Sequence, residues 1–370
     1  MDKKRKLLFD WGISDHYGWG IYGFNLVMYG QMNDKFEIVP LKKPSFMYPL
    51  DPMAGMFIAQ KLPKPNTNID PNSDDIFLTS LANNNQKLIK NKCRDIGVIF
   101  NEANPLPQGE IENLKKFEFI VSGSSWNTST LEKNGIKAHT VIQGVDSSLF
   151  RPSAKKFLKD KFVVFSGGKL EYRKGQDIVL KAFSIFASKH EDAVMVTAWR
   201  SPWEKNVAAT LNRSQICQPL QSSDDMDRAI YEWVINNGIK PEQIIPLDIV
   251  PNRLMPEVFR EVDLAVFPSR CEAGTNLVAM EALAFGLPCL ISKNTGHLDI
   301  IKNGNCFPLE SQKPISQLGT EGWGESSVEE IVELMEAAYS GRLKIDTNNV
   351  RNSMLEHSWE NAINSMLSLF

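Results

Sequence analysis

The residues best placed to do chemistry lie between Pro268 and Pro288, where a short apolar run leads through a small-residue loop into an apolar helix. Glu281 is the one charged side chain of the helix predicted at 276–285. A buried carboxylate without partners costs on the order of several kcal/mol, so it needs hydrogen-bond donors. Two ribose hydroxyl groups would supply them, and a salt bridge to a nearby Lys or Arg is the alternative.

The loop before this helix is small enough for a ligand to approach its backbone. Gly274, Thr275, Asn276 and Leu277 bring backbone N–H groups to the start of the helix, where the helix dipole favours an anion. We expect a diphosphate group there. Glu272 stands at the edge of the loop, where a carboxylate can accept hydrogen bonds from sugar hydroxyl groups. An exposed carboxylate at a helix start is the alternative.

A second informative stretch runs from Phe165 to Gln176, where a predicted strand is followed by a glycine loop. Lys169 and Lys174 flank this loop and could hold two phosphates as point charges, which would stabilise a departing diphosphate without a metal ion. Ordinary solvated lysines are the alternative. The loop is neither a Walker motif nor the dinucleotide Gly-x-Gly-x-x-Gly pattern.

Together these stretches resemble the retaining family 4 glycosyltransferases (glycosyl transferases group 1), which have the GT-B fold. The glycine loop Gly168–Gly175 resembles the donor-phosphate loop of that family, with Lys169 where an arginine is usual. The stretch Glu272–Glu281 resembles its paired-glutamate motif, although eight residues separate the two glutamates here instead of the usual seven. The resemblance extends from about Ser122 to Ile301.

The resemblance implies an α/β protein with two Rossmann-like domains whose parallel sheets face a central cleft. It also implies a retaining, metal-independent transfer of a hexosyl group from a nucleotide diphosphate sugar to an unidentified acceptor, without a cofactor. The acceptor is expected to be a glycan, a lipid or another small molecule. Asp224-Asp225, in a polar Ser-rich stretch, is interpreted as a solvated loop and not as a metal site.

In the first half, Gly18 and Gly20 resemble the N-terminal glycine loop of the family, and His16 lies where it could touch substrate. Glu102 follows the predicted strand that ends at Phe100, in place of the usual catalytic histidine. The candidate catalytic residues are therefore Glu272, Lys169, Lys174, Glu102 and His16. The candidate donor-binding residues are Glu281, Gly18, Gly20, Gly168, Arg173, Gly274, Thr275, Asn276 and Leu277.

Two other functions stay open. A nucleotide-sugar epimerase on the same fold would need acid/base pairs, which are not evident in the sequence. A nucleotide-sugar-binding protein without turnover is compatible with Asn101-Glu102 in place of the histidine.

Short apolar runs alternate with segments of helical period in both halves, which predicts parallel strands joined by crossover helices. Residues 42–75 are rich in Pro and Asn and are interpreted as loops. A polar, Lys-rich stretch at 153–161 predicts a linker, so we expect an acceptor-side domain at 1–155 and a nucleotide-sugar domain at 156–355. Residues 356–370 are expected to form a helix, and the resemblance implies that this helix crosses back to the first domain. The predicted strands are 6–11, 36–41, 95–100, 118–122, 162–166, 193–198, 264–267 and 289–292, and the predicted helices are 21–32, 128–134, 177–189, 276–285, 329–339 and 356–370.

Bulk properties limit the partners and the compartment. The 370 residues carry a formal net charge of −3 without a basic stripe, so nucleic acid is not an expected partner. The N-terminal apolar run is too short for a signal peptide and no window approaches a membrane span, which favours the cytoplasm. Peripheral contact with a membrane stays open. The five cysteines, without a Cys-x-x-Cys pair, are expected to be reduced thiols.

Overall fold

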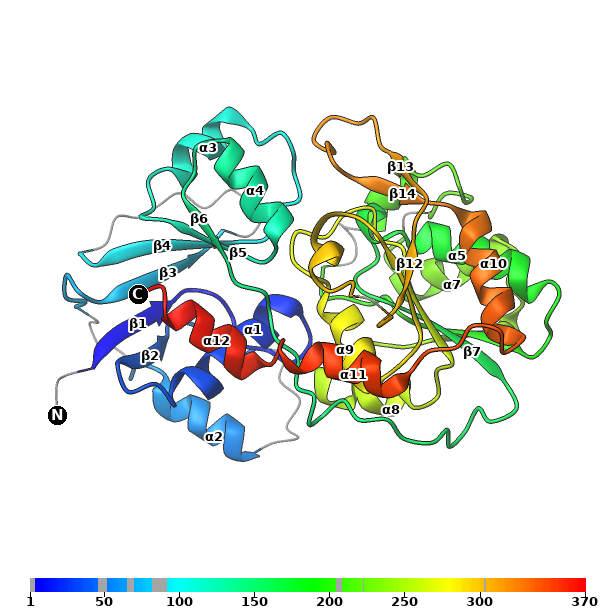
Figure 1. Ribbon diagram of the computed structural model, residues 1–370, viewed down its shortest axis with the longest axis horizontal. Coiled ribbons are helices and arrows are strands. Elements are labelled where there is room, and N and C mark those ends of the chain that lie inside the picture. The colour runs from blue at the N-terminus through cyan, green and yellow to red at the C-terminus, as the bar shows by residue number, and fades with distance from the viewer. Residues whose placement is uncertain are drawn as a thin grey trace. The chain divides into compact units, whose positions relative to one another are not determined.

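A computed structural model describes residues 4–45, 52–64, 70–81, 92–203, 208–221, 223–302 and 304–370. The chain divides into two compact units (Figure 1). The first comprises Met1–Gly144 together with His357–Phe370, and the second is Val145–Glu356. The junction after Gly144 precedes the stretch at 153–161 that the sequence suggests as a linker.

The first unit is built on a sheet of six parallel strands. Most of their residues are apolar and buried, as strands covered by helices on both faces require. In spatial order the strands are β2 (Phe36–Pro40), β1 (Arg5–Phe9), β3 (Ile76–Ser80), β4 (Arg94–Ile99), β5 (Ile120–Ser122) and β6 (Ala138–Thr140). The helices are α1 (Gly18–Gly30), α2 (Pro52–Lys61), α3 (Gln108–Leu114), α4 (Ser125–Lys133) and α12 (Trp359–Leu367).

Helix α12 comes from the far end of the chain and packs against α1, so red and blue ribbons lie together in Figure 1. The rings of Tyr22 and Trp359 are 5.8 Å apart, centroid to centroid. Gly144 is needed at this contact, because a Cβ there would lie 2.3 Å from the backbone of Trp359.

The second unit has its own sheet of six parallel strands, flanked by helices. In spatial order the strands are β12 (Phe307–Leu309), β11 (Cys289–Ser292), β10 (Leu264–Phe267), β7 (Phe162–Gly167), β8 (Ala193–Ala198) and β9 (Ile244–Pro246). The helices are α5 (Gln176–Ala187), α7 (Met226–Asn236), α8 (Met255–Phe259), α9 (Leu277–Phe285), α10 (Val328–Tyr339) and α11 (Thr347–Leu355), and a hairpin is formed by β13 (Gln312–Pro314) and β14 (Gly324–Ser326).

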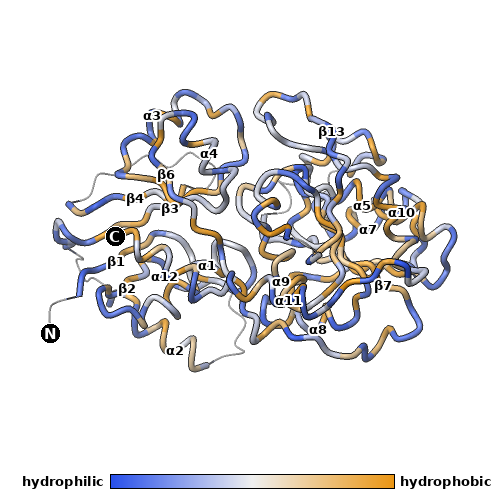
Figure 2. Tube along the Cα trace, in the orientation of Figure 1, coloured by the Kyte–Doolittle hydropathy of each residue, from blue (hydrophilic) through white to orange (hydrophobic). Residues whose placement is uncertain are grey.

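Strand order in this sheet determines where a ligand can bind. The chain runs outward from β7 to β8 and β9 on one side, and from β10 to β11 and β12 on the other. The point between β7 and β10 is therefore a topological switch point, the place where sheets of this kind bind ligands beyond the carboxyl ends of their strands. The central strands around it are hydrophobic (Figure 2), and β10 is buried along its whole length.

The predicted strands at 162–166, 193–198, 264–267 and 289–292 are confirmed as β7, β8, β10 and β11. The interpretation of 42–75 as loops is wrong for Pro52–Lys61, which forms α2, while 46–51 and 65–69 lie outside the described residues. The predicted helix 356–370 starts later, at Trp359, because the Ser358 hydroxyl accepts a hydrogen bond from the N–H of Asn361 and caps the helix.

The segment that enters the second sheet is held by one carboxylate. Glu261 accepts hydrogen bonds from the backbone N–H groups of Lys156 (3.0 Å), Phe157 (2.9 Å) and Leu158 (2.9 Å). Burial raises the pKa of Glu261, but these backbone donors outweigh burial and lower the pKa to about 2.

We expect Glu261→Gln to reduce the free energy of unfolding by roughly 1–3 kcal/mol at pH 7, because the three N–H groups lose a charged acceptor. The folded pKa of Glu261 lies below its ordinary value, so its stabilisation is present above that value and is lost as the pH falls through about 2. Urea unfolding of both proteins at pH 7 and pH 3 measures the effect. A difference that does not shrink at pH 3 would contradict this account.

Candidate functional site

The loops that follow β7 and β10 are pressed together at the switch point. Gly175 has φ +70, and a Cβ there would lie 2.3 Å from the carbonyl oxygen of Pro268, so no other residue fits without a shift of the backbone. The N–H of Arg270 donates to the carbonyl of Arg173 at 2.7 Å. The glycine loop and the glutamate loop therefore form one structural unit.

At their junction Glu272 is buried, with 3% of its surface exposed, and is surrounded by donors. Lys174 Nζ lies 2.7 Å and 3.0 Å from its two carboxylate oxygens, and Arg173 Nη1 donates at 2.8 Å. The Ser269 hydroxyl donates at 2.6 Å. Burial opposes ionisation, but Lys174 and Arg173 hold the pKa of Glu272 well below its usual range, so it is an anion.

A second carboxylate, Glu171, completes this cluster. It pairs with Arg173 Nη2 at 2.5 Å and with Lys169 Nζ at 3.2 Å. Three cations (Lys169, Arg173 and Lys174) and two carboxylates (Glu171 and Glu272) leave a net charge of +1. We call these five residues the cation cluster. The side chain of Lys169 is 40% exposed and that of Lys174 12%, so Lys169 forms the solvent side of the cluster.

Helix α9 begins beside the cation cluster with an unusual backbone. Asn276, its N-terminal flanking residue, has φ 63 and ψ 90, a conformation that costs a non-glycine residue roughly 1–3 kcal/mol. The Thr275 hydroxyl points inward to Met280 Sδ at 2.9 Å, so Thr275 can offer a ligand only its backbone. A Cβ at Gly296 would lie 1.8 Å from the Gly274 carbonyl, so the turn at 295–299 packs tightly against the loop.

Glu281 lies one turn into α9, with 5% of its surface exposed. Asn252 Nδ2, in the turn after β9, donates to its carboxyl group at 2.5 Å. Burial outweighs this hydrogen bond and raises the pKa of Glu281 to about 8. The partner in the described structure is thus an amide, and not the lysine or arginine that the alternative interpretation of the sequence required.

The first-unit candidates follow β1 and β4 at the carboxyl edge of their own sheet. His16 Nδ1 lies 2.5 Å from Asp15 Oδ1. Gly18 and Gly20 open α1, and a Cβ at Gly20 would lie 2.3 Å from the Cβ of Ser14, so packing alone requires this glycine. Glu102 follows β4 and is partly buried. The candidates of the second unit lie together in the structure. His16, Gly18, Gly20 and Glu102 belong to the first unit.

Sequence reasoning missed several residues that shape the site. Ser269 and Arg270 lie within the stretch that carried the prediction, but nothing in their spacing reveals their partners. Arg270 is fully buried, pairs with Asp177 at 2.6 Å and with Glu325 at 2.8 Å, and donates to the Tyr172 carbonyl. It joins the glycine loop, the glutamate loop and the β13–β14 hairpin.

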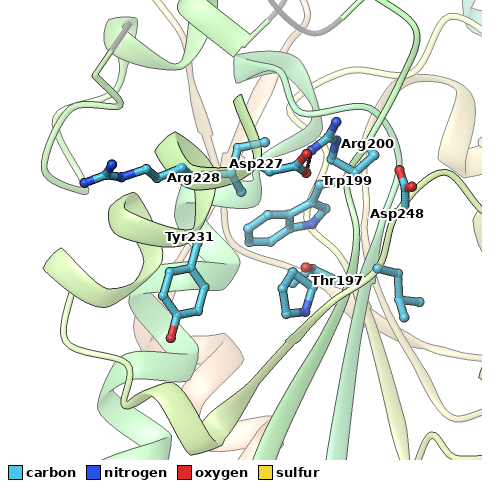
Figure 3. Close-up of a pocket in the computed structure, with 10 residues that line it drawn as sticks. Thr197, Trp199, Arg200, Asp227, Arg228, Tyr231 and Asp248 are labelled. Carbon is cyan, nitrogen blue, oxygen red and sulfur yellow. Dashed lines mark ion pairs between the residues drawn. The ribbon is translucent and has the colours of Figure 1, made fainter. Parts of the chain in front are cut away.

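The second unit also has a pocket of about 510 Å³ at the carboxyl ends of β8 and β9 (Figure 3). Trp199, Tyr231 and Arg200 line it, and Arg200 pairs with Asp227. Helix α7, which forms one wall, shares its core with α5 and α10, whereas α9 packs against α8 and α11. None of the candidate residues from the sequence lines this pocket, so it is separate from the cation cluster.

Two six-stranded parallel sheets with flanking helices match the GT-B fold of glycosyltransferase structures. The family described as Glycosyl transferases group 1 matches residues 149–315, which lie in the second unit, and this match identifies the protein as a glycosyltransferase. No curated protein sequence matches the chain.

Solved structures agree on the fold. A glycosyltransferase from Rickettsia africae has 12% identity and a TM-score of 0.66, over 99% of this chain and 97% of that one. HepE from Anabaena, in complex with UDP and glucose, has 12% identity and a TM-score of 0.66, over 99% and 100%. Sucrose-phosphate synthase from Thermosynechococcus elongatus has 13% identity and a TM-score of 0.66, over 99% and 98%. At these identities the likeness concerns the fold alone.

Within the described ranges, no group of three or more His, Cys, Asp or Glu side chains is arranged to hold a metal ion. Among the helices of the same ranges, none has the length and apolar character needed to cross a bilayer.

Glu281 leads to a prediction about pH. Its folded pKa of about 8 lies above its ordinary value of 4.5, so its contribution to stability is present below 4.5 and is lost as the pH rises through about 8. Glu281→Gln should therefore raise Tm above that of the parent at pH 9, by an amount equivalent to on the order of a few kcal/mol, and much less at pH 5. Exposed Glu333→Gln, on α10, is the control. Equal Tm differences at the two pH values would show that Glu281 is ionised throughout.

Proposed function

We propose that this glycosyltransferase moves a hexosyl group from a nucleotide diphosphate sugar to a glycan, lipid or other small acceptor, with retention of configuration and without a metal ion. The observation that carries the proposal is the cation cluster at the switch point between β7 and β10. It gathers three cations around two carboxylates at the edge of the sheet where ligands of such folds bind.

The donor would lie across both loops of the second unit. Lys174, Arg173 and the first N–H groups of α9 suit a diphosphate, since fixed positive charge and helix N-termini favour phosphate oxygens. Glu281 and Asn252 suit the ribose, which can donate to the carboxyl group from its hydroxyls. The UDP complex of Anabaena HepE, a protein of the same fold, supports a nucleotide donor.

Glu272 has a dual role in this proposal. Before the donor binds, its carboxylate neutralises Lys174 and Arg173 and keeps them ordered. When negative charge grows on the diphosphate, the same cations, already in place, stabilise it without reorganisation. A carboxylate at this place can also accept hydrogen bonds from the hydroxyls of the transferred sugar.

In the proposed reaction, the bond between the anomeric carbon and the diphosphate oxygen breaks and a bond from that carbon to the acceptor oxygen forms on the same face. The acceptor proton passes to a phosphate oxygen of the departing nucleoside diphosphate. Lys174, Arg173 and Lys169 hold the leaving group. His16, Glu102, Gly18 and Gly20 of the first unit are proposed for the sugar and acceptor.

Compartment and membrane contact belong to the same proposal. All five cysteines are free thiols, which supports a reducing compartment such as the cytoplasm. Peripheral contact with a membrane would serve a lipid acceptor, and sedimentation with anionic vesicles tests it.

The test is incubation with UDP-, GDP- and ADP-hexoses while NMR follows the anomeric signal. Slow release of free hexose with the donor's own configuration is expected, because a retaining transferase leaks some donor to water. An isomerised donor would make the protein an epimerase. Binding of a nucleoside diphosphate without any turnover, with or without acceptor mixtures, would make it a binding protein.

Substitution of Lys174 tests whether this lysine acts in donor binding or in the chemical step. Lys174→Ala should lower kcat by roughly a hundredfold or more, the scale of a lost electrostatic stabiliser, while KM for the donor rises less. Lys293→Ala, which removes an exposed lysine paired with Glu310, is the matched control. Steady-state kinetics on folded variants measure both constants. An unchanged kcat with a raised KM would assign Lys174 to uniform binding of donor and transition state.

Chelation tests the role of metal ions. Turnover should continue in EDTA at its full rate, because lysine and arginine side chains take the place of a divalent cation at the diphosphate. Loss of turnover in EDTA and its return on addition of Mg²⁺ or Mn²⁺ would be the contrary result.

A further inference from the structure

The loop after β10, from Ser269 to Asn276, is spanned by a chain of hydrogen bonds that runs through a different segment. Asn276 Nδ2 lies 3.3 Å from His297 Nε2, and His297 Nδ1 lies 2.8 Å from the Ser292 hydroxyl. That hydroxyl donates to the carbonyl of Ser269 at 2.7 Å. The chain thus begins and ends on the same loop.

The chemistry of these groups sets the direction of every bond. An amide nitrogen only donates, so His297 Nε2 accepts from Asn276 and carries no proton. The proton of the neutral ring is then on Nδ1, which donates to Ser292. Burial lowers the pKa of His297 to about 4, against the attraction of Glu272 4.0 Å away, so the ring is neutral as the bonds require.

His297 has no contact with solvent, so it is not placed to touch a substrate. Its partner Asn276, by contrast, flanks the start of α9 with φ 63 and ψ 90, a conformation that is costly for a residue other than glycine. The N–H groups that follow Asn276 are those proposed for the donor diphosphate. The conformation of Asn276 therefore decides where these donors point.

We propose that His297 is a positioning residue that, by accepting the Asn276 side-chain amide, holds Asn276 in its positive-φ conformation and aims the first N–H groups of α9 at the donor diphosphate. The diphosphate ligand in this proposal rests on the proposed function. The bracing of Asn276 by His297 is argued from the hydrogen bonds alone. Neighbouring contacts support the same loop: Glu272 N donates to Thr295 Oγ1 at 2.8 Å, and Gly296 N donates to the Glu272 carbonyl at 2.9 Å.

Two variants of His297 separate its hydrogen bond from its packing. The amide of His297→Gln reaches the position of Nε2 and can accept from Asn276, whereas the shorter amide of His297→Asn reaches only the position of Nδ1. A glycine adopts φ 63 without strain, so Asn276→Gly removes the need for a brace and serves as the second background.

Calorimetry with UDP, GDP and ADP on all variants gives the functional answer. We expect His297→Asn to weaken the nucleoside diphosphate that the parent binds by about tenfold, and His297→Gln by no more than about threefold. In the Asn276→Gly background, His297→Asn should weaken nucleoside diphosphate binding by less than a further twofold. An equal loss in both backgrounds, or a His297→Gln protein as weak as His297→Asn, overturns the proposal.

Thermal unfolding of the same proteins needs no ligand and keeps the two proposals apart. His297→Asn should lower Tm by about 2–4 °C in the parent and by less than half of that in Asn276→Gly. A parent that binds none of the three diphosphates, together with this coupling in Tm, would reject the proposed donor and retain the brace. No coupling in Tm would reject the brace.

Discussion

The second unit is organised around one electrostatic constraint, a buried carboxylate that must have cations beside it. Glu272 can stay ionised in the interior only because Lys174 and Arg173 reach it from a loop almost a hundred residues earlier in the chain, at a separation of 98 residues for Lys174. The two loops must touch for this pairing, so Gly175 has no room for a side chain. Arg270, itself fully buried, secures the contact by pairing with Asp177 at the start of α5. Removing Lys174 would leave Glu272 paired with Arg173, a cation that it shares with Glu171.

The same region holds several features that weaken the fold locally. Glu281 is buried among apolar residues with one amide partner, and Asn276 has a backbone conformation that glycine adopts more easily. Neither feature stabilises the free protein, and both are placed where a nucleoside diphosphate would meet the chain. Such local costs are typical of binding sites, where polar groups are held ready for a ligand and the surrounding core supplies the stability. In this protein, the stability comes from the buried apolar core that α5, α7 and α10 share.

Sequence patterns predict most of the sheet framework, because apolar runs bounded by turn residues report burial directly. The strands β7, β8, β10 and β11 and the helix α9 fall where the pattern indicates. Helix α2 was missed because Pro- and Asn-rich surroundings dominate a segment with only two buried side chains, Ala54 and Ile58. At the site, charge and glycine spacing indicate Glu272, Lys174 and Glu281, but the partners Asn252 and Ser269 depend on tertiary contacts that leave no periodic signal. The role of His297 likewise depends on a tertiary contact, with Asn276.

The order of the units along the chain has a consequence for synthesis. The second unit is one continuous segment, whereas the first is completed only by residues 357–370, whose Trp359 packs on Tyr22 and whose backbone meets Gly144. On the ribosome, Val145–Glu356 can fold as soon as it emerges, but the N-terminal sheet has to wait, with the surface that α12 covers exposed, until residues 357–370 have been translated. The N-terminal sheet, which is translated before the second unit, is thus completed after it. Chaperones that recognise nascent apolar surface can act on the sheet during the time in between.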